Sequence, residues 1–202
     1  MTKSLLAGAF ALATLPLSLG FMTRKALAQG PITPEQLTAL NFALRLERLE
    51  AAFYGQGLAS SLDFAETRPI FEQISKHEAA HVLVLETLLA SNAQPPPTFD
   101  FGSAFSSLDT FVTMAQGFED VGVRAYKGQV ETLATSAELL SLALRIHSVE
   151  ARHAAWIRRL AGITPAADAF DEPRSKRSTL AIVDDTHFVV RTRSRRKPKF
   201  TG

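Results

Sequence analysis

The chain has 202 residues, of which 46% are hydrophobic and 21% are charged, a balance typical of one soluble globular domain. It contains no cysteine, which excludes disulfide bonds, thiolate metal sites and cysteine nucleophiles. The pI of 9.1 comes from the chain ends, because residues 29–190 carry 13 basic and 20 acidic side chains, a net charge of −7. We therefore expect no nucleic-acid partner.

The N-terminal segment has the pattern of a secretory signal peptide. An apolar run at residues 5–21 precedes an A-x-A cleavage signal at residues 26–28. We predict removal of residues 1–28, a periplasmic or secreted mature protein, and no stable membrane span after cleavage. The alternative is an uncleaved anchor, which Arg24 and Lys25 favour because basic residues after the apolar run hinder export.

Two helices are predicted in the first half. The first has Thr33 as N-cap and Gln36 closing a capping box, and it fades at Gly55–Gly57. The second starts between residues 67 and 69 and runs to about residue 90. The next 17 residues contain three consecutive prolines and can reach about 55 Å, whereas a 22-residue helix is about 33 Å long. This connection can therefore run along a bundle and leave the second and third helices parallel.

Two further helices are predicted after this crossover. The third covers roughly residues 108–130, and the fourth begins with a capping box of Thr135 and Glu138 and ends before Gly162. The resulting division is a signal peptide at 1–28, a four-helix bundle at 29–163, an extension that docks on the bundle at 164–190, and a basic disordered tail at 191–202.

An offset of 72 residues relates chemically matching positions in the two halves of the chain. Each half has a Glu, a Tyr seven residues later, and a Glu-x-x-His unit that begins 31 residues after the first Glu. Residues three apart share a helix face, and aliphatic residues on neighbouring turns direct that face toward the core. The matching pairs are Glu47 and Glu119, Tyr54 and Tyr126, Glu78 and Glu150, and His81 and His153.

Four buried carboxylates would repel one another, and the matching positions hold no Lys or Arg to neutralise them. Two divalent cations would supply the missing positive charge. The alternative is that these are scattered surface residues, but such residues would not share one offset. One Glu from each of two helices and a Glu-x-x-His from each of the others is the ligand set of di-iron and di-manganese bundles. The expected ligands of two Fe or Mn ions are Glu47, Glu78, His81, Glu119, Glu150 and His153, with Glu78 and Glu150 bridging.

Several stretches match a known family: residues 40–44 and 46–54, Glu78-x-x-His81, Glu119 with Ala125-Tyr126, residues 149–153 and residues 170–173. Over roughly residues 32–190 the sequence resembles the bacterial ferritin-like domain proteins related to plant desiccation-related proteins. The resemblance implies an all-α, ferritin-like four-helix bundle with a long crossover between its second and third helices, and a di-metal site. Iron storage is not implied.

Three further residues are candidates for a role at this site. Glu50 lies one turn from Glu47, and its counterpart in the other half is Gly122. It resembles the extra carboxylate of rubrerythrin-type sites, and a Glu at the wetter end of the bundle is the alternative. Tyr54 and Tyr126 could hydrogen-bond a ligand or take an electron, or they could be ordinary core tyrosines.

The expected function is redox chemistry with O2 or peroxide, or iron handling in stress protection. A non-catalytic structural or stress protein with a stabilising metal is the alternative, and a homo-oligomer is compatible with either. Residues 77–81 also match the H-E-x-x-H signature of zinc metalloproteases, with His77 and His81 as ligands and Glu78 as general base. Val149 replaces His77 in the second half, which argues against this reading. We expect the remaining histidines to lie at the surface.

Overall fold

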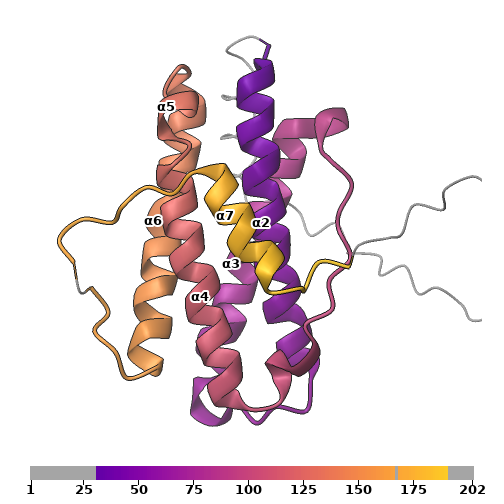
Figure 1. Ribbon diagram of the computed structural model, residues 1–202, viewed down its shortest axis with the longest axis vertical. Coiled ribbons are helices and arrows are strands. Elements are labelled where there is room, and N and C mark those ends of the chain that lie inside the picture. Colours follow the sequence, from indigo (N-terminus) through magenta and orange to yellow (C-terminus); the bar gives the residue numbers. More distant parts are fainter. Residues whose placement is uncertain (1–30, 167, 191–202) are drawn as a thin grey trace, which may run out of the picture.

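The computed structural model describes residues 31–166 and 168–190, so the predicted signal peptide and basic tail lie outside the described residues. Regular structure in the described residues is helical, apart from one isolated β-bridge between Phe99 and Val189. The α-helices in Figure 1 are α2 (Pro34–Ala59), α3 (Arg68–Leu89), α4 (Leu108–Lys127), α5 (Val130–Leu133), α6 (Ala137–Leu160) and α7 (Lys176–Asp185). Single 3-10 turns lie at Ala65–Thr67, Ala90–Asn92 and Gly102–Phe105.

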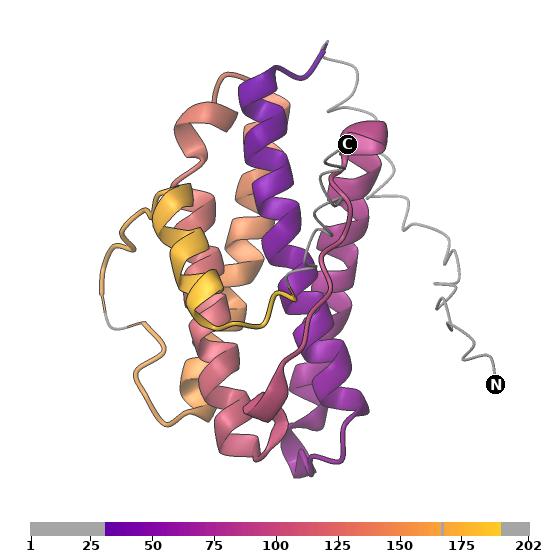
Figure 2. The same cartoon turned by 45° about the vertical axis from the view of Figure 1, so that its right-hand side comes forward.

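Helices α2, α3, α4 and α6 form a four-helix bundle (Figures 1 and 2). The first two are antiparallel neighbours, and so are α4 and α6, with the short α5 between them. The connection after α3 runs along the outside of the bundle to the start of α4, so these two helices point the same way (Figure 2). The predicted all-α bundle with a long crossover between its second and third helices is therefore confirmed.

The start of α2 follows the prediction, whereas its end does not. Thr33 Oγ1 accepts a hydrogen bond from the Gln36 backbone N–H at 3.2 Å, and Gln36 Oε1 accepts one from the Thr33 N–H at 2.9 Å. The helix continues past the predicted stop at Gly55–Gly57 and ends at Ala59. Gly57 is buried against the ring of Phe111. This packing holds the last turn in place although glycine disfavours a helix.

The predicted capping box of the last bundle helix is wrong. The N-cap is Ser136, whose Oγ accepts a hydrogen bond from the Leu139 backbone N–H at 3.1 Å. Thr135 has another partner, because its hydroxyl accepts a hydrogen bond from Gln36 Nε2 on α2 at 2.9 Å. A contact between distant segments thus moves the helix start by one residue.

Helix α4 also ends three residues earlier than predicted. The backbone of Arg174 packs against Gly128 so closely that a Cβ there would lie 2.0 Å from the Arg174 carbonyl oxygen. The Arg174 N–H donates a hydrogen bond to the Arg124 carbonyl at 2.9 Å. The segment after the bundle therefore contacts the end of α4, and position 128 has no room for a side chain.

The C-terminal segment fastens the crossover to the bundle. Helix α7 lies across the bundle with Val183 buried (Figure 1). Beyond it, the Val190 N–H donates to the Thr98 carbonyl and the Asp100 N–H donates to the Phe188 carbonyl, both at 2.9 Å. None of the described helices combines the length and the apolar character needed to span a lipid bilayer.

Within residues 31–166 and 168–190, the core consists of two apolar clusters. One is rich in phenylalanine and includes Phe53 and Phe111, whose stacked ring centres lie 4.6 Å apart. The other is mainly aliphatic and includes Leu44 and Leu85. On α3 and α6 the Glu-x-x-His units lie between the stretches that contribute to the two clusters. Polar residues at this level are therefore enclosed by apolar packing on both sides.

Two interhelical ion pairs follow the 72-residue offset. Arg48 and Glu86 join α2 to α3 at 2.7 Å, and Asp120 and Arg158 join α4 to α6 at 2.6 Å. The offset pairs Arg48 with Asp120 and Glu86 with Arg158, so the positions are kept while the charges are exchanged. In the described part of the chain, the α2–α3 hairpin and the α4–α6 hairpin thus each have an ion pair at a matching level.

Replacing Gly57 with alanine should destabilise the protein, although alanine is the better helix former. The new Cβ would lie 2.3 Å from Phe111 Cε2, so the ring must shift within a packed core, at roughly 1–3 kcal/mol. Gly55→Ala is the matched control, because this exposed position on the same helix has no atom within 4 Å of a new Cβ. It should gain roughly 0.5–1 kcal/mol. Urea unfolding compares the two, and equal stability of the two variants would contradict this packing.

Candidate metal centre

The candidate ligands meet at one level of the bundle, and all are buried. Their helices fix their positions, because residues three apart on α3 and on α6 face the same way. The contributors are Glu47 and Glu50 from α2, Glu78 and His81 from α3, Glu119 from α4, and Glu150 and His153 from α6. The four carboxylates of the expected ligand set have no exposed surface. Sequence reasoning therefore identified residues that the fold does bring together.

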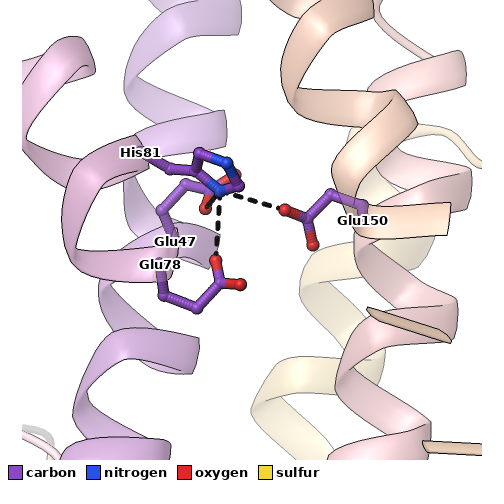
Figure 3. A group of neighbouring side chains, drawn as sticks. All are labelled: Glu47, Glu78, His81 and Glu150. Carbon is purple, nitrogen blue, oxygen red and sulfur yellow. Dashed lines mark hydrogen bonds and ion pairs between the residues drawn. The ribbon is translucent and has the colours of Figure 1, made fainter. Parts of the chain in front are cut away.

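The first histidine points its Nδ1 at three carboxylates (Figure 3). His81 Nδ1 lies 3.1 Å from Glu47 Oε2, 3.3 Å from Glu78 Oε2 and 3.0 Å from Glu150 Oε1. These groups come from three different helices. Four ligand atoms, one from each of these residues, lie within 4.8 Å of one another, which is close enough to surround one metal ion.

The second histidine repeats this arrangement on the other side. His153 Nδ1 lies 2.8 Å from Glu78 Oε1, 3.5 Å from Glu119 Oε2 and 4.0 Å from Glu150 Oε2. Ligand atoms of these four residues also lie within 4.8 Å of one another. Glu78 and Glu150 belong to both groups. The two groups therefore overlap in two carboxylates.

The two tyrosines support the carboxylates of the opposite half. Tyr54 on α2 donates a hydrogen bond to Glu119 Oε1 on α4, and Tyr126 on α4 donates one to Glu47 Oε1 on α2, both at 2.5 Å. Each glutamate thus has one oxygen held by a phenol while its second oxygen faces a histidine. Burial and these neighbouring carboxylates raise the pKa of both tyrosines well above the usual value, so both phenols stay protonated donors.

Glu50 is buried beside the centre rather than at a wet end of the bundle. It is 2% exposed, and a Cβ added at Gly122 would lie 3.2 Å from Glu50 Oε1 and 3.4 Å from Glu150 Oε2. The glycine therefore leaves the space that the carboxylates of Glu50 and Glu150 occupy. Burial, with the charges of Glu150 and Glu119 next in importance, raises the pKa of Glu50 well above its usual range.

His77 contacts the centre from outside, a relation that sequence spacing did not reveal. Its Nδ1 lies 2.8 Å from His153 Nε2, and neither of the two ligand groups includes it. The H-E-x-x-H reading requires His77 and His81 to bind one ion together, and the described residues do not form that group. Of the other histidines, His187 is exposed and His147 is half-buried.

Without a cation, Glu50, Glu78 and Glu150 hold protons more tightly than ordinary glutamates. Burial raises the pKa of Glu78 to about 7. Burial, and then the charges of Glu78 and Glu47, raise the pKa of Glu150 well above its usual range. For Glu47, burial alone would raise the pKa, but the charge and hydrogen bond of His81 outweigh it and lower the pKa.

The neighbouring carboxylates raise the pKa of both histidines of the centre. Burial alone would lower the pKa of His153, but Glu119 and Glu78 raise it to about 10. Burial also opposes the charge of His81, yet Glu47 and Glu150 raise the pKa of that ring well above 6.5. Protons thus occupy the centre when no cation does.

Several oxygens of the centre lack a hydrogen-bond donor and are therefore able to bind a cation. Within the described residues these are Glu78 Oε1, Glu119 Oε2 and both oxygens of Glu150. His153 Nδ1 approaches Glu78 Oε1 without the alignment of a hydrogen bond. Buried polar atoms without partners are costly, and oxygen-rich ligation with one imidazole per ion suits Fe or Mn. The residues present therefore fit a metal centre.

A four-helix bundle with a crossover and a buried Glu and His cluster defines a class of metal-binding helical proteins. The chain belongs to the ferritin-like domain family, whose model matches residues 35–162. No curated protein matches the chain. The family membership confirms the predicted resemblance at the level of the domain, and the relation to desiccation-related proteins stays a prediction.

The metal-free protein should lose stability as the pH rises. The pKa of Glu78 is about 7 in the folded state and 4.5 in the unfolded chain, and the pKa of His153 is about 10 in the folded state and 6.5 in the unfolded chain. The folded state therefore binds more protons than the unfolded state. The stabilisation is complete below the unfolded pKa of each group and is lost as the pH rises through the folded pKa.

Urea unfolding of chelator-treated protein measures this dependence. We expect the free energy of unfolding to fall from pH 4.5 to about 7 through Glu78 and from pH 6.5 to about 10 through His153. Glu78→Gln should make the lower part of the curve less steep, because glutamine does not titrate, whereas Glu50 and Glu150 still do. A stability that rises over this range would contradict the proton balance described here.

Proposed function

We propose that the chain is a carboxylate-bridged di-metal protein that carries two Fe or Mn ions at the level of Glu78 and Glu150. The observation that carries the proposal is the pair of overlapping ligand groups, which share these two carboxylates. The remaining proposed ligands would hold one ion each: Glu47 and His81 on one side, Glu119 and His153 on the other. Membership of the ferritin-like domain family supports the same reading.

We further propose redox chemistry with O2 or peroxide, or iron handling in stress protection, for this centre. Bound Fe or Mn would supply one-electron redox steps and Lewis-acid activation of an oxygen ligand. The N-terminal pattern supports a site of action outside the cytoplasm.

The surrounding residues would orient the ligands and control water and protons. The phenols of Tyr54 and Tyr126 hold one oxygen of Glu119 and Glu47, which fixes how each carboxylate presents its second oxygen. Apolar clusters on both sides limit the entry of water. Glu50 Oε1, beside the gap left by Gly122, can hold a proton next to Glu150 or serve as a seventh ligand.

Glu150→Ala should remove both ions, because the lost carboxylate is shared by both positions. Metal analysis of protein purified without chelator should give about two ions per wild-type chain and close to none for the variant. Glu72→Ala is the control, since this glutamate lies on α3 in a surface ion pair with Arg68 and should keep wild-type occupancy. Unchanged occupancy in Glu150→Ala would reject the shared-carboxylate centre. It would favour the protease reading, in which Glu150 has no role.

Metal-loaded wild-type protein should consume O2 or peroxide faster than the same concentration of free Fe(II) or Mn(II). Oxygen-electrode and peroxide-decay assays measure this, with Glu150→Ala mixed with the same metal as the matched control. A loaded protein that binds about two ions yet shows no consumption above the control would reject the redox proposal and leave a structural metal.

A further inference from the structure

The two metal positions differ in what lies behind their histidines. His153 contacts His77 through Nε2. His81 has the same relation to the centre, but its hydrogen bonds and ion pairs with other described residues all involve Nδ1. The 72-residue offset explains the difference, because the residue matching His77 is Val149, which cannot accept a hydrogen bond.

The two rings are placed for a direct hydrogen bond. His77 Nδ1 and His153 Nε2 lie 2.8 Å apart, and the ring planes differ by 11°. The ring centres lie 5.1 Å apart. Two imidazole rings with a nitrogen contact of 2.8 Å reach this separation only when both nitrogens lie close to the line between the ring centres. The rings therefore meet edge to edge in nearly one plane, as a linear N–H···N hydrogen bond requires.

The outer ring is itself held at the surface. His77 is half-buried on α3, and its Nε2 lies 2.6 Å from the side-chain amide of the exposed Gln73. An amide group can face a ring nitrogen with its oxygen or its NH2 group, so it suits either tautomer of His77. A series of close polar contacts thus runs from Gln73 through His77 and His153 to Glu78.

The chemistry of a metal-binding histidine gives this chain a direction. A ring that binds a cation through Nδ1 must carry its proton on Nε2, and a partner that accepts this proton fixes both the tautomer and the ring orientation. Such a partner also raises the basicity of the ligand nitrogen, and its loss typically costs 10–100-fold in metal affinity. His77 Nδ1 is the acceptor that His153 Nε2 faces.

We propose that His77 is a positioning residue that holds His153 with Nδ1 toward the centre and makes the His153 position the tighter of the two metal positions. This inference rests on the proposed di-metal centre. It also gives the H-E-x-x-H stretch a role outside protease chemistry, in which the first histidine supports a ligand from another helix. The two ions then bind in order, first beside His153 and Glu119, and second beside His81 and Glu47.

Isothermal titration calorimetry with Mn(II) and the chelator-treated full chain tests the inference. The wild type should bind in two steps of unequal affinity. His77→Val copies the residue of the other half and should weaken the tighter step 10–100-fold, so that the two steps merge. His77→Asn should restore the tighter step, because its Oδ1 can accept a hydrogen bond near the place of Nδ1.

The comparison of these two variants separates positioning from stability. Valine and asparagine have similar helix propensities, so metal-free His77→Val and His77→Asn should melt alike while their Mn(II) affinities differ. A purely structural role would change both melting temperatures and leave the affinities equal. His77→Ala replaces the valine variant if that protein does not fold. His187→Asn is the surface control, because asparagine tolerates the φ of 60° at this exposed histidine.

The possible results distinguish the inference from the function on which it rests. No Mn(II) binding by the wild type would overturn the di-metal proposal itself. Two equal steps in the wild type, or two unequal steps that persist in His77→Val, would overturn the role of His77 alone. Two unequal steps that merge in His77→Val, return in His77→Asn and are unchanged in His187→Asn support it.

Discussion

The neutralisation of buried glutamates is the interaction on which the rest of this structure depends. Five carboxylates and two imidazoles lie at one level of the bundle, and the four carboxylates of the proposed ligand set have no exposed surface. Burying charge without compensation is far more costly than any single packing contact is favourable. In the metal-free chain, protons provide the compensation, with the pKa of His153 raised to about 10 and that of Glu78 to about 7. Divalent cations would replace those protons and bind the carboxylate oxygens that have no hydrogen-bond donor.

Both hairpins of the bundle, α2–α3 and α4–α6, contribute residues to each ligand group. Glu78 from one hairpin and Glu150 from the other face both histidines, so neither ligand group is complete within one hairpin. The tyrosines add a second link, because each phenol holds a glutamate of the opposite hairpin. The apolar clusters on both sides fix the helices at the spacing that these contacts require. Cations bound at this level would therefore couple to the association of the two hairpins, because ligands that bind only the folded state stabilise it.

Much of this could be predicted from the sequence, because the relevant signals are local or periodic. The Thr33 cap and the inward direction of each Glu-x-x-His unit depend on residues within one or two turns. The misplaced boundaries depend on distant contacts: Gln36 bonds Thr135 from another helix, and Phe111 covers Gly57. The contact between His77 and His153 was missed for the same reason, since it joins residues 76 apart whose relation no spacing rule encodes. The 72-residue offset located the ligands because it compares the halves rather than their contacts.

Anomalous X-ray diffraction from crystals soaked with Mn(II), recorded at the manganese edge, tests whether two ions share Glu78 and Glu150. We expect two peaks about 3.5–4 Å apart, both within bonding distance of Glu78 and Glu150. One peak should lie beside Glu47 and His81, and the other beside Glu119 and His153. A single peak between His77 and His81, or no peak at this level of the bundle, would contradict a centre in which two ions share Glu78 and Glu150.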